Sequence, residues 1–174
     1  MGSCIKRRVL LVCVENSDRS QMAEAFARKF GGDVIEPASA GTHPASRVSP
    51  TVVDVMKERQ IDLSTRTPQL LTTRLVEEAD LIITMGCSVK EVCPAPMVKH
   101  SIDWKLEDPS CKSIDEVRRI RDEVERKVRE LVDSLRPGKS QDKSEHQERF
   151  SFDSGVPSIA LLYSDTVSRI FASN

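Results

Sequence analysis

The stretch RVLLVCVENSDRSQMAEAFARKF, residues 8–30, decides the fold that the sequence predicts. Its first part, Arg8–Cys13, is a continuous apolar run, typical of a strand that is buried on both faces. Its last part, Ser20–Phe30, repeats large apolar side chains at every fourth residue from Met22, which predicts an amphipathic helix. A buried strand that leads through a short polar loop into a helix is typical of parallel α/β proteins.

The rest of the chain continues this alternation of strands and helices. We expect a three-layer, flavodoxin-like α/β domain, in which helices cover both faces of a parallel sheet. Ligands of such sheets bind beyond the carboxyl ends of the strands, where the first and third strands bring Cys13 and Cys87. The other predicted strands are Asp33–Pro37 and Ala79–Met85, and the other predicted helices are Pro50–Arg59, Leu71–Glu78 and a long one from Ser113 to Leu135.

Composition suggests one globular domain with an appendage. The 174 residues are 39% hydrophobic and 30% charged, with a net charge of −1, which favours neither nucleic acid nor a membrane as partner. We expect residues 1–135 to be the catalytic domain and residues 136–174 to be a C-terminal extension. The extension combines a polar linker, Lys139–Arg149, with a short apolar segment, Val156–Phe171.

The cysteines point to chemistry rather than to structural crosslinks. There are five of them, an odd number at irregular spacing, and the N-terminal residues do not read as a secretion signal. We therefore expect a cytoplasmic protein whose thiols serve catalysis, redox exchange or metal binding. Cys87 and Cys93 have no companion ligands at a usual spacing, so we predict no metal site.

The loop after the first strand is the candidate site. Cys13 and Arg19 are separated by five residues, and such a loop can turn its backbone N–H groups inward around an oxyanion. Arg19 can hold two oxygens of that anion, and the same field favours the thiolate of Cys13. Alternatively, Cys13 is a small core residue and Asn16 only forms a turn. The predicted oxyanion-binding residues are Val14, Glu15, Asn16, Ser17, Asp18, Arg19 and Ser20.

This loop and three later segments resemble a known family. VCVENSDRSQMAEAF, residues 12–26, resembles the opening of the thioredoxin-coupled arsenate reductases and of the related low-molecular-weight phosphotyrosine phosphatases. The resemblance covers about residues 7–135. The other matching segments are Ser39–Thr42, Met85–Cys87 with Cys93 and Pro94, and Asp103–Pro109.

The resemblance implies a mechanism as well as a fold of four parallel strands flanked by helices. Cys13 would attack arsenate, and Asp108 would act as general acid. Cys87 and Cys93 would pass the resulting disulfide outward to thioredoxin, the implied reductant. The resemblance implies no organic cofactor.

Two alternatives stay open at this stage. A low-molecular-weight protein tyrosine phosphatase needs only the nucleophile, the loop and the acid, but those enzymes usually carry aromatic residues where Ser110 and Cys111 follow the Asp-Pro pair. A non-catalytic, oxyanion-binding regulatory protein is suggested by Glu15 and by Asp18, which stands where both families usually have cysteine. A carboxylate that faced the pocket would oppose both anion binding and thiolate formation.

Overall fold

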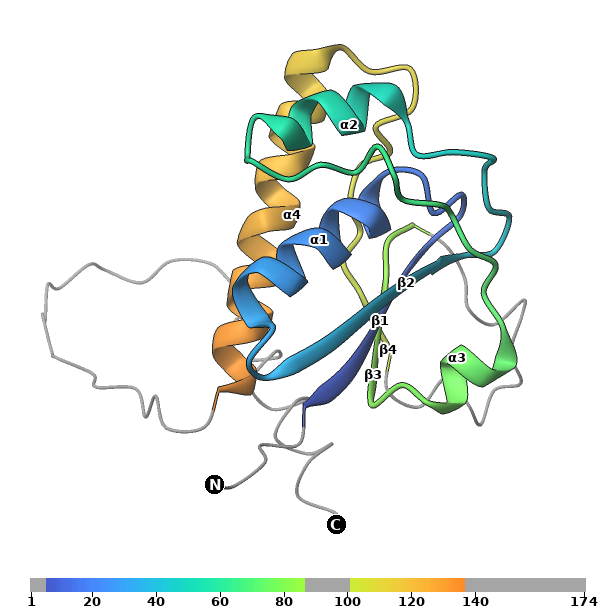
Figure 1. Cartoon of the computed structure of the whole chain (residues 1–174), viewed down its shortest axis with the longest axis vertical. Helices are drawn as coiled ribbons and strands as arrows, with labels where there is room; N and C mark the ends of the chain where they lie inside the picture. The colour runs from blue at the N-terminus through green and yellow to red at the C-terminus, as the bar shows by residue number, and fades with distance from the viewer. Residues whose placement is uncertain (1–5, 87–100, 137–174) are drawn as a thin grey trace, which may run out of the picture. The chain divides into compact units, whose positions relative to one another are not determined.

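The computed structural model describes residues 6–86 and 101–136. From Arg7 to Leu135 the described residues form four strands and four helices (Figure 1). Its elements are β1 (Arg7–Cys13), α1 (Arg19–Gly31), β2 (Ile35–Gly41), α2 (Pro50–Lys57), α3 (Thr73–Glu77), β3 (Leu81–Thr84), β4 (Ser101–Asp103) and α4 (Ile114–Leu135).

The four strands form one parallel sheet in the order β2-β1-β3-β4. Its register aligns the strand ends, because Cys13 is paired with Gly41, and Thr84 lies between Val12 and Asp103. The loops that follow β1, β2, β3 and β4 therefore all leave from the same edge. This arrangement confirms the predicted α/β fold and brings the candidate site to the carboxyl ends of the strands.

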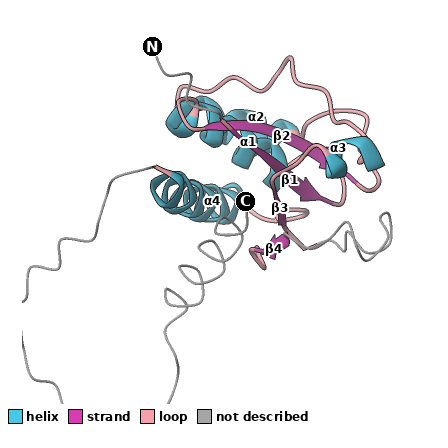
Figure 2. Ribbon diagram, turned by 90° about the horizontal axis from the view of Figure 1, so that it is seen from below, coloured by secondary structure: helices cyan, strands magenta, loops and turns pink. Residues whose placement is uncertain are grey.

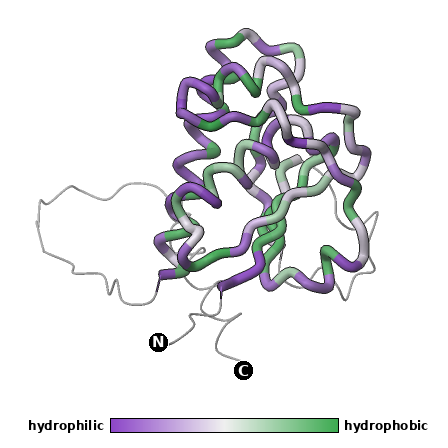
Figure 3. Tube along the Cα trace, viewed as in Figure 1, coloured by the Kyte–Doolittle hydropathy of each residue, from purple (hydrophilic) through white to green (hydrophobic). Residues whose placement is uncertain are grey.

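Alternation along β1 divides the core into two layers of side chains. Val9, Leu11 and Cys13 pack with α1, α2 and α4, whereas Leu10 and Val12 pack with α3. Figure 2 shows the sheet between these two groups of helices, and Figure 3 shows the hydrophobic strands at the centre. The strand is buried on both faces, as its apolar run predicts.

Helix α4 begins with a capping box. The N–H of Ser113 donates to the carboxylate of Glu116 at 2.9 Å, and the N–H of Glu116 donates to the Ser113 hydroxyl at 3.3 Å. An apolar stripe is buried along this helix, with Leu135 partly buried at its end. The stripe consists of Val117, Ile120, Val124, Val128 and Leu131.

The predicted bounds of the second strand, Asp33–Pro37, are wrong. The strand β2 starts at Ile35 and continues past Pro37 to Gly41. Proline interrupts a central strand because it lacks an N–H, but β2 is at the edge of the sheet, where that group is not needed. The helix predicted as Leu71–Glu78 is shorter, and Thr72 caps its start through a hydrogen bond from the Leu75 N–H.

The extension beyond Arg136 stays a prediction, because residues 137–174 lie outside the described part of the chain. Within the residues that are described, no helix combines the length and apolar character needed to cross a bilayer.

Candidate active site

The loop between β1 and α1 turns its carbonyl groups away from the sulfur of Cys13. The carbonyls of Cys13, Val14, Glu15 and Ser17 accept hydrogen bonds from backbone N–H groups of residues 42–49, at 2.8–3.3 Å. In a planar trans peptide the N–H of the next residue points opposite to the carbonyl. The N–H groups that follow these carbonyls therefore point to the inside of the loop, as an anion cradle requires.

The sulfur of Cys13 is buried and accepts hydrogen bonds from this loop. Cys13 is 2% exposed, and the N–H of Asn16 donates to its sulfur at 3.2 Å. The hydroxyl of Ser20 lies 2.9 Å from the same sulfur. Asn16 has a φ of +50°, the left-handed conformation that asparagine tolerates, and this turns its N–H toward Cys13. A thiolate at this position is stabilised by two donors.

Arg19 lies at the first residue of α1 and is 6% exposed. One terminal nitrogen donates to the carbonyl of Leu106 at 3.2 Å, and the other pairs with Asp108 at 3.1 Å. Its Nε is buried and donates to no group of the described chain. A buried donor without a partner is costly, so an incoming oxyanion that accepts from it gains binding free energy.

Gly86 makes room for this guanidinium. It follows β3 with a φ of +73°, and a Cβ on it would lie 2.8 Å from a terminal nitrogen of Arg19. Any other residue would be strained by the backbone and would crowd the arginine. The sequence analysis included Gly86 in the matching segment Met85–Cys87. The reason for a glycine there, its close contact with Arg19, is seen only in the structure.

Asp108 lies in the loop after β4 and faces Arg19. Burial raises the pKa of Asp108, but hydrogen bonds from Ser110 and the charge of Arg19 outweigh it, so the pKa lies below its ordinary value. The carboxylate is thus ionised and paired when no oxyanion is bound. The predicted acid and the predicted anion ligand are in contact.

Asp18 and Glu15 form an acidic rim beside the loop. The hydroxyl of Ser17 donates to Asp18 at 2.7 Å and lies 3.2 Å from Glu15. Burial raises the pKa of Asp18, hydrogen bonds from Ser17 and Ser49 lower it, and the nearby carboxylates add to the rise. Asp18 has no ion pair with any side chain of the described segments.

Several residues that hold the loop escaped the sequence reasoning. The amide oxygen of Asn16 accepts from the side chain of Gln21 at 3.1 Å and from the N–H of Gln69 at 2.9 Å. A Cβ on Gly41 would lie 2.6 Å from the Val14 carbonyl oxygen, so β2 packs directly against the loop. Cys87 and Cys93 lie outside the described residues.

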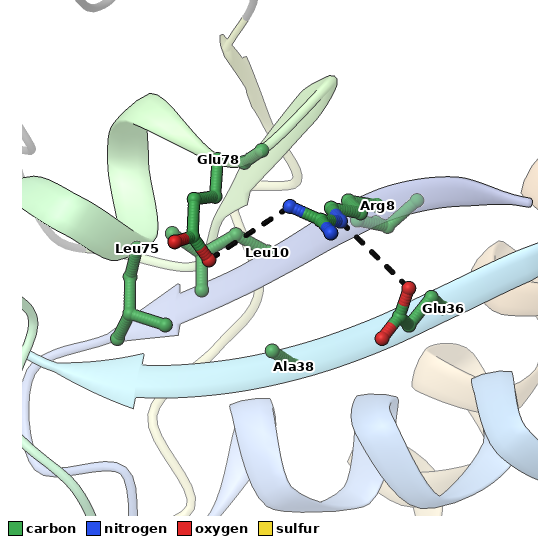
Figure 4. A pocket seen from close by; sticks show the side chains of 8 residues that line it. Arg8, Leu10, Glu36, Ala38, Leu75 and Glu78 are labelled. Carbon is green, nitrogen blue, oxygen red and sulfur yellow. Dashed lines mark ion pairs between the residues drawn. The ribbon is translucent and has the colours of Figure 1, made fainter.

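A cavity of about 470 Å³ opens beside the loop. Its described lining mixes polar side chains, among them Glu15 and Asp18, with apolar ones such as Val52 and Val117, and includes no aromatic side chain. A second cavity, of about 140 Å³, lies at the other end of β1 between Arg8, Glu36 and Glu78 (Figure 4). It shares no residue with the loop, whereas Glu15, Ser17 and Asp18 of the loop border the first cavity.

Comparison with known proteins agrees with this geometry. The chain is 42% identical to a putative arsenate reductase of Halobacterium salinarum, over 72% of this chain and 91% of that protein. It superposes on a structure titled "An arsenate reductase in the phosphate binding state" with a TM-score of 0.67 and 34% identity, covering 75% of this chain and 99% of the other.

A thioredoxin-dependent arsenate reductase of Corynebacterium glutamicum superposes with a TM-score of 0.63 and 38% identity, covering 75% of this chain and 62% of that one. The profile of the family described as low molecular weight phosphotyrosine protein phosphatase matches residues 8–141, from the first strand past the last helix. With its parallel sheet, the loop that follows Cys13 and this match, the chain belongs to the low molecular weight phosphotyrosine protein phosphatase family, together with the arsenate reductases that it resembles.

Proposed function

We propose that this chain reduces arsenate to arsenite, with Cys13 as nucleophile and thioredoxin as reductant. The observation that carries the proposal is the buried sulfur of Cys13 among the N–H of Asn16 and the hydroxyl of Ser20, beside an arginine whose Nε lacks a partner in the described chain. Relatives at 32–42% identity that are named arsenate reductases support arsenate as the oxyanion. A cytoplasmic location, where thiols are kept reduced, suits this chemistry.

The first step uses the loop, Arg19 and Asp108. Arsenate takes the place of the Asp108 carboxylate on Arg19, and its negative charge raises the pKa of Asp108 so that the acid takes up a proton. The thiolate of Cys13 then attacks arsenic. A sulfur–arsenic bond forms, an arsenic–oxygen bond breaks, and Asp108 gives its proton to the leaving oxygen.

The second step is the reduction. Cys87 attacks the sulfur of Cys13, the sulfur–arsenic bond breaks, and its electron pair stays on arsenic, which leaves as arsenite. Cys93 then attacks Cys87, frees Cys13 and forms a Cys87–Cys93 disulfide, which thioredoxin reduces by thiol–disulfide exchange. Support comes from the sequence, since Cys87 directly follows Gly86, the residue that packs against Arg19.

Arsenite release with thioredoxin, thioredoxin reductase and NADPH tests this proposal. We expect Cys13→Ser and Cys87→Ser to release no arsenite and Cys93→Ser to stop after one turnover. The matched control is Cys111→Ser, since Cys111 is exposed and has no role in the relay. Sustained arsenite release by Cys87→Ser would refute the relay.

A second candidate function is aryl phosphate hydrolysis. The one observation in its favour is the pairing of Arg19 with Asp108. The cavity beside the loop offers no aromatic side chain among its described residues to grip a phenyl ring. If the chain is a phosphatase, hydrolysis of an aryl phosphate will be fast and will survive Cys87→Ser. A purely regulatory oxyanion-binding protein would bind arsenate and leave it unreduced in the same assay.

A further inference from the structure

Glu24 is a buried carboxylate close to the loop that the mechanism does not use. It lies in α1, is 3% exposed, and is held by two guanidinium groups. Arg28 reaches one of its oxygens, Oε1, at 2.7 Å, and Arg66 pairs with the other, Oε2. Burial of a carboxylate is costly unless it is paired in this way. Glu24 and its two arginines therefore form a fixed group of charges beside the Cys13 loop.

A chain of hydrogen bonds leads from Oε2 of Glu24 to the sulfur. The hydroxyl of Ser39 donates to Oε2 at 2.6 Å and accepts from the side-chain nitrogen of Asn16 at 3.0 Å. The same nitrogen donates to the hydroxyl of Ser20 at 2.8 Å. Because the oxygen of Ser20 accepts from this amide, the proton of Ser20 is left to donate to the sulfur of Cys13, 2.9 Å away. A carboxylate only accepts, so it fixes the direction of every bond in this chain.

A second chain of hydrogen bonds starts from Arg66, the arginine that pairs with Oε2 of Glu24. The Nε of Arg66 donates to the side-chain oxygen of Gln21 at 3.3 Å, and the nitrogen of Gln21 donates to the oxygen of Asn16 at 3.1 Å. A guanidinium only donates, so it fixes the orientation of the Gln21 amide. The N–H of Gln69 also donates to Asn16, which holds the Asn16 oxygen away from Ser20.

Arg66 thus contacts the first group of each chain, Oε2 of Glu24 in one and Gln21 in the other, and both chains meet at the Asn16 amide. We propose that Arg66 is a positioning residue, which fixes the orientation of the Asn16 amide and thereby holds Cys13 as a thiolate. Arg28 carries the same charge to the same carboxylate, but it contacts the oxygen that Ser39 does not use. Replacement of Arg28 is thus a control, because it removes the same charge from Glu24 without touching either hydrogen-bond chain.

The remaining charges near the loop are unchanged when Arg66 is replaced. They belong to the loop itself, to the start of α1 and to the segment after β4. These groups are Glu15, Asp18, Arg19, Asp108 and Lys112, together with Arg47 from the segment after β2. A change in the pH dependence of Cys13 alkylation is then due to the loss of the two hydrogen-bond chains that Arg66 contacts.

The test is the pH dependence of Cys13 alkylation by iodoacetamide, followed by peptide mass spectrometry in Arg66→Met, Arg28→Met and Arg126→Met. We expect Arg66→Met to move the half-maximal rate about one pH unit higher, which makes alkylation about tenfold slower below that pH. Arg28→Met should move it much less. Arg126→Met, which breaks an exposed pair with Glu130 in α4, should not move it. Equal shifts for Arg66→Met and Arg28→Met, or no shift in a folded Arg66→Met, would overturn the proposal.

Two further variants keep the test decisive if Arg66→Met does not fold. Arg66→Lys keeps the charge but cannot serve both Glu24 and Gln21 in the same geometry, so we expect an intermediate shift. A cavity of about 320 Å³ borders Glu24, Gln21 and Arg66, so dissolved guanidinium can enter Arg66→Ala. Millimolar guanidinium chloride should restore the profile of Arg66→Ala, and sodium chloride at equal ionic strength should not. Equal recovery in both salts would contradict a directional role.

This inference rests on the proposed function only in that Cys13 is the nucleophile. Alkylation requires neither arsenate nor thioredoxin. If the wild type releases no arsenite while Arg66→Met still shifts the profile, the proposed activity is wrong and the role of Arg66 stands. If the wild type releases arsenite and Arg66→Met does not shift the profile, the proposed activity stands and the role of Arg66 is wrong.

Discussion

The guanidinium of Arg19 and the carboxylate of Asp108 lie 3.1 Å apart, although 89 positions separate them in the sequence. This pair connects the start of α1 with the loop after β4 across the carboxyl edge of the sheet. It also sets a competition, because an oxyanion and Asp108 require the same arginine. The side chain of Asp108 is 58% exposed, so water can solvate its carboxylate when the anion replaces it on Arg19.

Replacement of this acid should therefore have opposite effects on catalysis and on binding. We expect Asp108→Asn to lower the rate of arsenite release by about 10²- to 10⁴-fold, since a general acid contributes about that much. Phosphate, used as a non-reducible probe, should bind several-fold more tightly, because the competing charge is gone. The coupled assay and calorimetric titration measure the two quantities. Asp103→Asn is a matched control at the end of β4, and weaker phosphate binding by Asp108→Asn would contradict the competition.

A side chain at residue 86 should damage the oxyanion site. Gly86→Ala forces a Cβ toward Arg19 and places alanine at a φ of +73°, a conformation that costs about 1–2 kcal/mol. We expect a loss of unfolding free energy of that size and at least a tenfold loss of phosphate affinity. Urea unfolding and titration with phosphate measure the two effects. Unchanged affinity in a destabilised variant would show that Arg19 accommodates the methyl group.

The acidic rim should weaken anion binding at neutral pH. Asp18→Asn removes a charge next to the loop, and a unit charge about 4 Å away in water contributes about 1 kcal/mol, so we expect a KM for arsenate that is a few-fold lower. Asp54→Asn in α2, which changes the net charge equally, is the control and should leave KM unchanged. An unchanged KM for Asp18→Asn would place its charge outside the reach of the anion.

The same variant gives a pH-dependent stability. Because the pKa of Asp18 is raised in the folded protein, ionisation of this group at neutral pH opposes folding. Asp18→Asn should therefore be more stable than the wild type near pH 7. The gain should disappear below about pH 3.8, the ordinary value, where the carboxyl is protonated in both the folded and the unfolded chain. Thermal melting across this range measures the difference.

The fold was largely predictable because its central elements carry strong local patterns. The apolar run of β1 and the capping box of α4 act over a few residues, so they are visible in the sequence. The end of β2 was mispredicted because proline normally ends a strand and edge position cannot be read locally. The strand Ser101–Asp103 has only three residues and no apolar run, and only the family resemblance required a fourth strand.

The candidate site was predictable where it follows from one loop. Cys13, Asn16 and Ser20 lie within eight positions of the sequence, and the N–H of Asn16 and the hydroxyl of Ser20 both contact the Cys13 sulfur. Two partners of the Asn16 side chain come from elsewhere, since Ser39 and Gln69 lie 23 and 53 positions away and reach the loop through folding alone. The roles of Cys87 and Cys93 stay predictions.

The outward carbonyls of the nucleophile loop make the neighbouring segment a reporter of its shape. The amides of Thr42, His43, Ala45 and Ser49 are bonded to those carbonyls, so their deuterium uptake is slow only while the loop keeps its curve. Mass spectrometry of a peptide that contains no cysteine thus follows opening of the loop during turnover, without a label on any thiol.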